Sequence, residues 1–84
     1  GRIPKLTNFS QSVIKPGQFC PAHVHPDMWE VYLVQYGEGT ITIEGNDLEV
    51  KQGDCVIVDP GEKHSMQNRG KTDDLHLTYF GIEQ

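Results

Sequence analysis

The spacing of apolar residues along the chain predicts β-strands and no helix. Glycine or proline interrupts almost every window of about 11 residues in which apolar positions would have to recur at helical spacing. Short apolar or alternating segments recur instead between turn-forming residues, at positions 13–14, 29–36, 40–44, 48–50, 55–58, 64–68 and 74–80. Roughly eight short strands, with a turn signal every 8–12 residues, are typical of an all-β sandwich or barrel.

Three of these segments carry a more specific expectation. Residues 29–36 are rich in aromatic and β-branched side chains, and residues 40–44 alternate strictly between polar and apolar. Because only Gly37-Glu38-Gly39 separates them, we predict that these two segments pair as a β-hairpin. Residues 55–58 (CVIV) are apolar throughout and predict a buried strand.

The length and charge of the chain limit what it can be. Its 84 residues suffice for one domain, and we expect a single domain over residues 1–84 with an N-terminal arm at residues 1–8. The formal net charge is −5, and the seven Lys and Arg residues are scattered. Phosphate binding needs clustered basic side chains, so nucleic acid is excluded as a partner. Since the chain has neither an apolar run of about 18 residues nor a basic-then-apolar leader, we expect no membrane span and a cytoplasmic location.

The two cysteines, Cys20 and Cys55, are too few for a disulfide-stabilised scaffold. They do not form a CxxC pair, and their spacing is not that of a cysteine metal site. We predict two buried free thiols, with a disulfide as the alternative.

Three of the four histidines, together with one glutamate, suggest a metal site. His23 and His25 are two residues apart, so on one strand both imidazoles leave the same face, about 6.6–6.8 Å apart. Glu30 follows a bend, and His64 comes from a distant strand. Three imidazoles and one carboxylate suit a divalent first-row metal (Fe, Mn, Ni, Cu, Co or Zn) better than calcium or magnesium. The alternative for the HxH pair alone is two polar residues facing solvent.

The spacing of these residues resembles two motifs of the cupin superfamily. The first motif is matched without a gap by Gly17-x5-His23-x-His25-x4-Glu30-x6-Gly37. The second is matched by Gly53-x5-Asp59-x-Gly61-x2-His64-x3-Asn68, except that Asp59 stands at the usual proline position and the proline follows at Pro60.

The resemblance implies a small antiparallel jelly-roll β-barrel, the double-stranded β-helix, with one divalent transition metal inside it. It implies His23, His25, Glu30 and His64 as the metal ligands, and all four ligand positions are filled in this sequence. The superfamily includes dioxygenases, isomerases, epimerases, decarboxylases, storage proteins and ligand-binding domains of regulators. Membership therefore does not define a reaction.

The alternation of side chains along the strands predicts which residues surround the metal. Residues that share a face with a metal ligand are expected to line the substrate pocket, although each of them is equally a candidate core residue. The predicted lining consists of Phe19, Tyr32, Val34, Tyr36, Met66 and Asn68. The chain has only two arginines, Arg2 in the arm and Arg69 on the opposite face from His64, so strongly anionic substrates are disfavoured.

Two features remain outside this pattern. His76 lies on a strand whose inner face the sequence does not reveal, so solvent exposure and an acid/base role both stay open. Trp29, Val31 and Leu33 have the opposite parity to Glu30 and form an apolar strip that needs a cover. Either the N-terminal segment or a second subunit would cover it, and we expect a homodimer.

Two functions follow as hypotheses. The first is a metal-dependent enzyme that acts on a small molecule by dioxygenation or isomerisation, with Glu30 as a candidate catalytic base. The second is a non-catalytic ligand-binding or sensor module, possibly part of a longer protein. A purely structural barrel is the weakest alternative, because four ligand-type residues would then converge without use.

Overall fold

The computed structural model describes residues 6–83, without the side chains of residues 6–8 and of His23. Eight strands make up this part of the chain: β1 (Leu6–Ile14), β2 (Phe19–His23), β3 (Met28–Tyr36), β4 (Glu38–Ile43), β5 (Asn46–Lys51), β6 (Cys55–Val58), β7 (His64–Gln67) and β8 (Leu75–Glu83). The described residues contain no helix, so no helical segment among them is long and apolar enough to cross a membrane. The predicted all-β class is confirmed.

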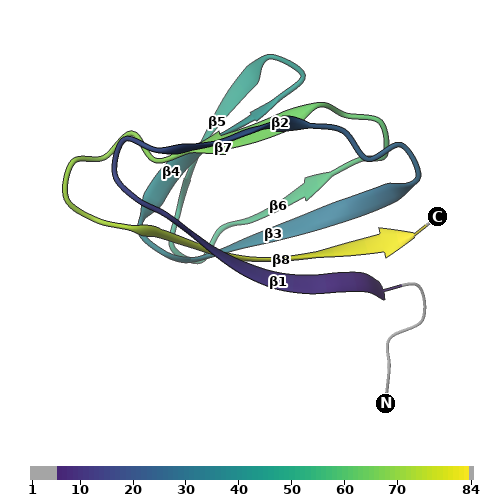
Figure 1. Cartoon of the computed structure of the whole chain (residues 1–84), viewed down its shortest axis with the longest axis horizontal. Coiled ribbons are helices and arrows are strands. Elements are labelled where there is room, and N and C mark those ends of the chain that lie inside the picture. Colours follow the sequence, from purple (N-terminus) through teal and green to yellow (C-terminus); the bar gives the residue numbers. More distant parts are fainter. Residues whose placement is uncertain (1–5, 84) are drawn as a thin grey trace.

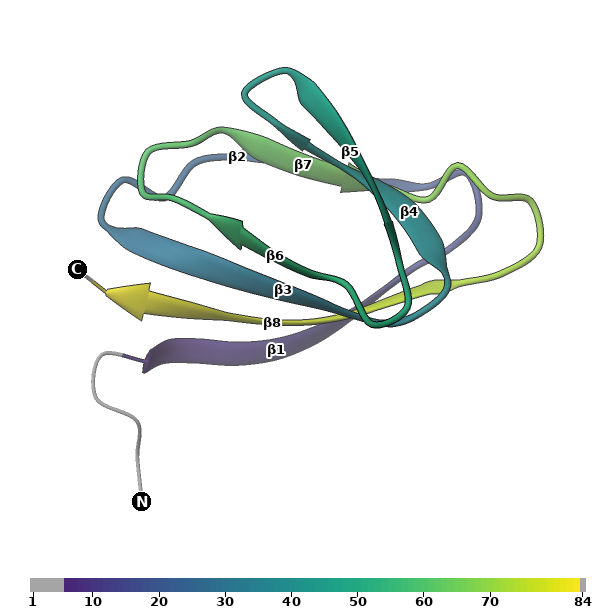
Figure 2. The same ribbon diagram turned by 180° about the vertical axis from the view of Figure 1, so that it is seen from behind.

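The strands form two four-stranded antiparallel sheets that face each other (Figure 1). One sheet has the order β1-β8-β3-β6 and the other the order β2-β7-β4-β5. Seen from behind in Figure 2, the two sheets again form separate layers. The turn between β4 and β5 projects beyond the other strands of the second sheet. Consecutive strands mostly alternate between the sheets, which is the strand connectivity of a jelly-roll barrel.

The predicted hairpin between residues 29–36 and 40–44 is wrong. β3 pairs with β6 and β8, whereas β4 pairs with β5 and β7, so the chain crosses from one sheet to the other at Gly37. Gly37 has a φ of 86°, and a β-carbon at this position would collide with the backbone carbonyl of Asp74. The glycine therefore serves a tight crossing instead of a hairpin turn.

The core lies between the sheets and follows the period-two alternation of the strands. In β3, for example, Glu30, Tyr32 and Val34 are buried, while the residues between them are partly exposed. The buried apolar side chains are Ile14, Tyr32, Val34, Ile41, Val50, Val58, Met66, Leu75 and Leu77.

The cysteines and β6 differ from the sequence-based expectation. Cys20 and Cys55 are free thiols, but Cys55 is exposed and Cys20 is only partly buried. Val56 and Val58 of β6 face the interior, while Cys55 and Ile57 face outward. Because every strand of a two-layer fold buries one face only, a continuous apolar run did not mean burial on both faces.

The outer face of the first sheet carries a continuous apolar row. The strand register brings Phe9, Phe80, Val31 and Ile57 side by side across β1, β8, β3 and β6. The rings of Phe9 and Phe80 stack with their centroids 6.2 Å apart, and Ile57 is 59% exposed. We call these four residues the apolar row.

The N-terminal arm expected at residues 1–8 lies partly outside the described residues. The strand β1 begins at Leu6, and the backbones of Leu6 and Asn8 pair with β8. Residues 1–5 lie outside the description.

Candidate metal centre and its cavity

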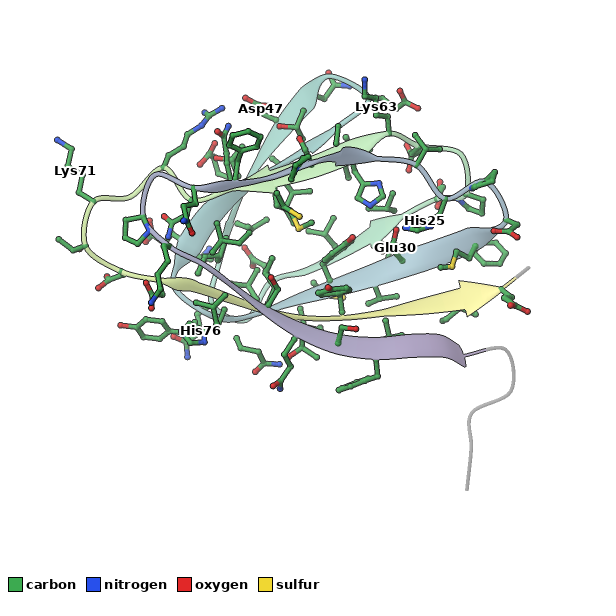
Figure 3. The ribbon with its side chains drawn as sticks, viewed as in Figure 1. His25, Glu30, Asp47, Lys63, Lys71 and His76 are labelled. Atoms are coloured by element: carbon green, nitrogen blue, oxygen red, sulfur yellow. The ribbon has the colours of Figure 1, made fainter. Side chains whose placement is uncertain are left out.

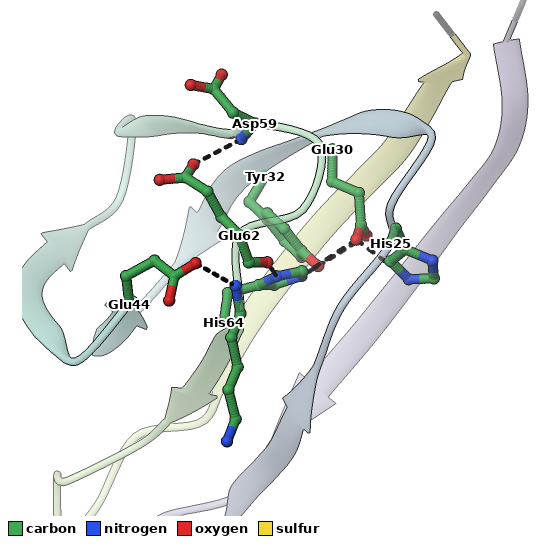
Figure 4. Close-up of polar contacts among 8 residues, drawn as sticks. His25, Glu30, Tyr32, Glu44, Asp59, Glu62 and His64 are labelled. Atoms are coloured by element: carbon green, nitrogen blue, oxygen red, sulfur yellow. Dashed lines mark hydrogen bonds and ion pairs between the residues drawn. The ribbon is translucent and has the colours of Figure 1, made fainter.

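Glu30 is the buried centre of the site. It belongs to β3, where the strand alternation turns its side chain toward the second sheet, and only 4% of the residue is exposed. A carboxylate at this depth requires positively charged or hydrogen-bonding partners. The site provides them from three directions, as Figure 4 shows.

His64 faces Glu30 from the opposite sheet. It opens β7, is 1% exposed, and places Nε2 3.1 Å from Oε1 of Glu30. Its Nδ1 lies 3.1 Å from the backbone carbonyl of Glu62. Because a carbonyl can only accept, this contact is a hydrogen bond with the proton on Nδ1, which points Nε2 at the carboxylate.

His25 approaches the same carboxylate oxygen from the mouth of the barrel. Its Nε2 lies 3.2 Å from Oε1 of Glu30, and its side chain is 41% exposed. The expectation that His23 and His25 share one strand is wrong, because β2 ends at His23 and His25 lies in the following loop. The carbonyl of His25 accepts a 2.9 Å hydrogen bond from the amide of Gly61, which ties this loop to the turn before His64.

Tyr32 fixes the other oxygen of the carboxylate. Its hydroxyl donates a 2.9 Å hydrogen bond to Oε2 of Glu30 and lies 3.1 Å from Nε2 of His64. Burial, followed by the hydrogen bond and the negative charge of Glu30, raises the pKa of Tyr32 well above its usual range. The phenol therefore stays protonated and holds Glu30 so that Oε1 is turned toward the two imidazoles.

These contacts gather atoms that can hold a proton or a cation. The Nε2 atoms of His25 and His64 both meet a single carboxylate oxygen, and either a hydrogen on Nε2 of His25 or a bound cation would make these contacts favourable. Ligand atoms about 2.1 Å from a metal and at right angles to one another lie about 3 Å apart, close to the separations found here. The donor set of imidazole nitrogens and a buried carboxylate thus fits a divalent transition metal.

In the described part of the chain, which lacks the His23 imidazole, no three His, Cys, Asp or Glu side chains are already arranged around a common point for a metal. The two histidines contact Glu30 directly instead. The backbone of His23 pairs with that of His64, which brings the fourth predicted ligand position to the same end of the sheet.

A cavity of about 460 Å³ opens next to this cluster, between the two sheets. Figure 3 shows His25 and Glu30 between the layers, and these two residues mark the end of the molecule at which the cavity lies. Its polar lining consists of Ser12, Cys20, His25, Glu30, Tyr32 and Tyr79. Its apolar lining consists of Ile14, Met28, Met66 and Leu77.

Of the six residues predicted to line a substrate pocket, the structure places Tyr32 and Met66 in the cavity wall. Val34 is buried in the core beside it. Asn68 is also buried, but its side chain donates to the carbonyls of Ile14 and Asp73, so it joins β7 to β1 and to the following loop.

The structure places the other two, Phe19 and Tyr36, outside the cavity. Phe19 is 67% exposed, because Cys20 is the residue of β2 that faces inward, and a register shift follows Cys20 in the pairing with β7. Tyr36 is half exposed, because a β-bulge between Val34 and Tyr36 reverses the alternation at the end of β3. A bulge leaves no clear mark in a single sequence.

Six lining residues were not predicted from the sequence: Ser12, Ile14, Cys20, Met28, Leu77 and Tyr79. Leu77 and Tyr79 belong to the strand whose inner face was left undecided, and the alternation of Leu75, Leu77 and Tyr79 was the available signal. Ser12 carried no signal, because a polar residue on an edge strand is ordinarily read as outward-facing. Met28 lies at the start of β3, just before the predicted strand.

His76 is placed away from this site. It packs edge-on against Tyr36, with ring centroids 5.7 Å apart, on the outer side of the first sheet. Figure 3 shows it at the opposite end of the molecule from His25 and Glu30.

Comparison with known proteins agrees with this architecture. The family model described as "Cupin domain" matches residues 11–81, so the chain belongs to the cupin domain family. Members of this family commonly hold a divalent metal.

Individual relatives bear more specific names. An oxalate-binding protein of Thermotoga maritima is 37% identical over 69 residues, which are 82% of this chain and 57% of that protein. A crystal structure described as a predicted oxalate decarboxylase, also from Thermotoga maritima, superposes with a TM-score of 0.89 at 34% identity, covering 95% of this chain and 69% of that one.

A third solved structure is an uncharacterised protein with a double-stranded β-helix domain from Klebsiella pneumoniae. It has a TM-score of 0.84 at 26% identity, over 89% of this chain and 65% of that one. The chain thus spans little more than half of the curated relative and about two thirds of these solved structures.

Proposed function

We propose that this chain binds a divalent transition metal through His23, His25, Glu30 and His64 and uses it to hold a small molecule with oxygen donors. The observation that carries the proposal is the convergence of two imidazole nitrogens on one oxygen of a buried carboxylate, 3.1 and 3.2 Å away, beside an open cavity. The relative named as an oxalate-binding protein supports a ligand of this kind.

The residues around the ligands have defined tasks in this proposal. Tyr32 and the carbonyl of Glu62 orient Glu30 and His64, as outer partners of metal ligands generally do. The metal, when bound, supplies a Lewis acid that attracts carboxylate or carbonyl oxygens. The apolar cavity wall keeps water away from the bound molecule, which strengthens electrostatic contacts there.

The second candidate is catalysis at the same metal, either the dioxygenation or isomerisation expected from the sequence or a decarboxylation. The solved structure described as a predicted oxalate decarboxylase favours the last of these. Glu30 is the candidate base, since it lines the cavity and its Oε2 is held by Tyr32. The two candidates separate by turnover: metal-loaded protein that binds a small carboxylic acid without releasing carbon dioxide, consuming oxygen or isomerising the acid is a binding module.

Metal content tests the ligand assignment directly. We expect elemental analysis to find about one transition metal ion per chain after reconstitution, and His64→Ala to lose nearly all of it. His76→Ala is the matched control, because it removes an imidazole that packs against Tyr36 on the outside. Equal metal content in the two variants would contradict the assignment.

We also propose that the chain forms a homodimer through the apolar row. Phe9, Phe80, Val31 and Ile57 span all four strands of one sheet without a charged residue among them. Two copies of such a face match each other without bringing like charges together, despite the net charge of −5.

A further inference from the structure

We infer that the cavity selects a singly charged chelating molecule with an apolar tail, and not a small dianion such as oxalate. This inference rests on the proposed metal site and adds the class of molecule that the site takes. Three properties of the described lining support it: its charge, the nature of its walls and its size.

The charge of the site matches one negative charge on the ligand. Glu30 is the acidic residue of the described lining, which contains no Lys or Arg. A divalent ion together with the Glu30 carboxylate leaves one net positive charge, which a monoanion neutralises. A dianion would leave an uncompensated negative charge in a largely apolar cavity, in a chain that already carries a net charge of −5.

The walls away from Glu30 suit a hydrocarbon group. Ile14, Met66 and Leu77 are each no more than 5% exposed and come from both sheets. The thioether of Met66 adapts to irregular shapes at low cost. The stacked rings of Tyr32 and Tyr79, with centroids 5.4 Å apart, add an aromatic surface.

The size of the cavity points the same way. About 460 Å³ lies within the range of pockets that hold molecules much larger than oxalate, roughly 300–1,000 Å³. A two-carbon dianion bound at the metal would leave most of this space without ligand contacts. A chelating head with a branched or aromatic tail fills it and removes apolar surface from water.

A series of α-keto acids isolates the contribution of the tail. Pyruvate, α-ketoisocaproate and phenylpyruvate chelate through the same carboxylate and keto oxygens and differ in the apolar group. With Mn²⁺-loaded protein, we expect calorimetry to show at least about tenfold tighter binding of the two larger acids than of pyruvate, the gain that added methylene groups bring in an apolar pocket. Equal affinities, or a preference for pyruvate, would overturn the inference.

A charge added to the lining tests selectivity against dianions. Met28 is a half-buried lining residue, and Met28→Arg adds a cation to the described lining, which contains no Lys or Arg. We expect this variant to bind oxalate about tenfold more tightly than the unchanged protein and to bind α-ketoisocaproate more weakly. Met28→Gln is the control, because it replaces the same side chain without adding a charge. Each ligand is compared between the variant and the unchanged protein, so the intrinsic affinity of oxalate for Mn²⁺ cancels.

The outcomes separate this inference from the function on which it rests. If Mn²⁺ is bound and oxalate binds as tightly to the unchanged protein as to Met28→Arg, the metal site stands and the selectivity is wrong. If elemental analysis finds no Mn²⁺ and none of the acids binds, both are wrong. If Met28→Arg does not fold, the α-keto acid series alone decides.

Discussion

Tyr32 shows how one residue serves both the core and the site. Its ring packs on Tyr79 and on the edge of the His64 imidazole, while its hydroxyl holds the Glu30 carboxylate. A residue with 1% exposure is normally there to fill space. Here the same burial keeps the phenol protonated, so that it can only be a hydrogen-bond donor to Glu30.

The burial of this phenol predicts a loss of stability in alkaline solution. Because the folded pKa of Tyr32 is raised, the native state keeps a proton that the unfolded chain releases near pH 10. This contribution is fully present below about pH 10 and falls by about 1.4 kcal/mol per pH unit above it. Denaturant unfolding of metal-free protein from pH 9 to 11 measures it.

Two tyrosine variants isolate this effect. Tyr32→Phe should show a shallower decline in the free energy of unfolding above pH 10 than the unchanged protein. Tyr36→Phe removes a half-exposed phenol and should keep the full decline. The same slope in both variants would mean that Tyr32 is not the group responsible.

The sequence predicted buried side chains where a strand is regular and failed where its pairing shifts. The residue types and the resemblance to the cupin motifs selected Glu30 and His64, and the structure brings these two together across the sheets. The prediction failed at Phe19 and Tyr36, because parity arguments assume an uninterrupted strand and a register shift or bulge lies beside each of them. Where the backbone stays regular, as from Glu30 to Val34, alternation gave the buried face.

At the scale of elements, strand positions were predictable and strand partners were not. Apolar segments bounded by glycine and proline gave β3 to β8 to within about three residues at most ends. The pairing of β3 with β6 and β8 depends on contacts far apart in the sequence. The same turn residues serve a hairpin and a crossing between sheets, so Gly37-Glu38-Gly39 could not distinguish the two.

The crossing at Gly37 predicts a large cost for a small substitution. Gly37→Ala would adopt an unfavourable positive φ and would also bring its methyl group against the carbonyl of Asp74. We expect it to lower the free energy of unfolding by about 3 kcal/mol, measured by chemical denaturation. Gly45→Ala is the matched control: its φ is 79° and nothing lies within 4 Å of its added carbon, so about 1 kcal/mol is expected.

At the scale of the molecule, the apolar row predicts the oligomeric state. Ile57→Glu puts a charge into the proposed interface, at the end of the apolar row on β6, and should convert a dimer to a monomer in light scattering coupled to size exclusion. Leu48→Glu is the control, since Leu48 is also exposed but belongs to β5 in the other sheet. A dimer that survives Ile57→Glu, or a monomeric unchanged protein, would exclude this interface.

Metal binding should stabilise the whole molecule. A ligand present at 100 times its dissociation constant adds about 2.7 kcal/mol to the stability of the folded state. For a domain of this size that raises the melting temperature by about 10 °C or more. Differential scanning calorimetry with and without Mn²⁺ measures the gain, and His64→Ala should show none of it.

The ligands of the proposed site belong to opposite layers: Glu30 stands on β3 and His64 on β7. Neither sheet alone can assemble the cluster, and 34 positions of chain separate these two residues. Occupancy of the site therefore reports whether the layers are closed on each other. A fluctuation that separates the two sheets should release the ion before the strands within either sheet unpair. The rate of metal dissociation would therefore measure how often the two sheets separate.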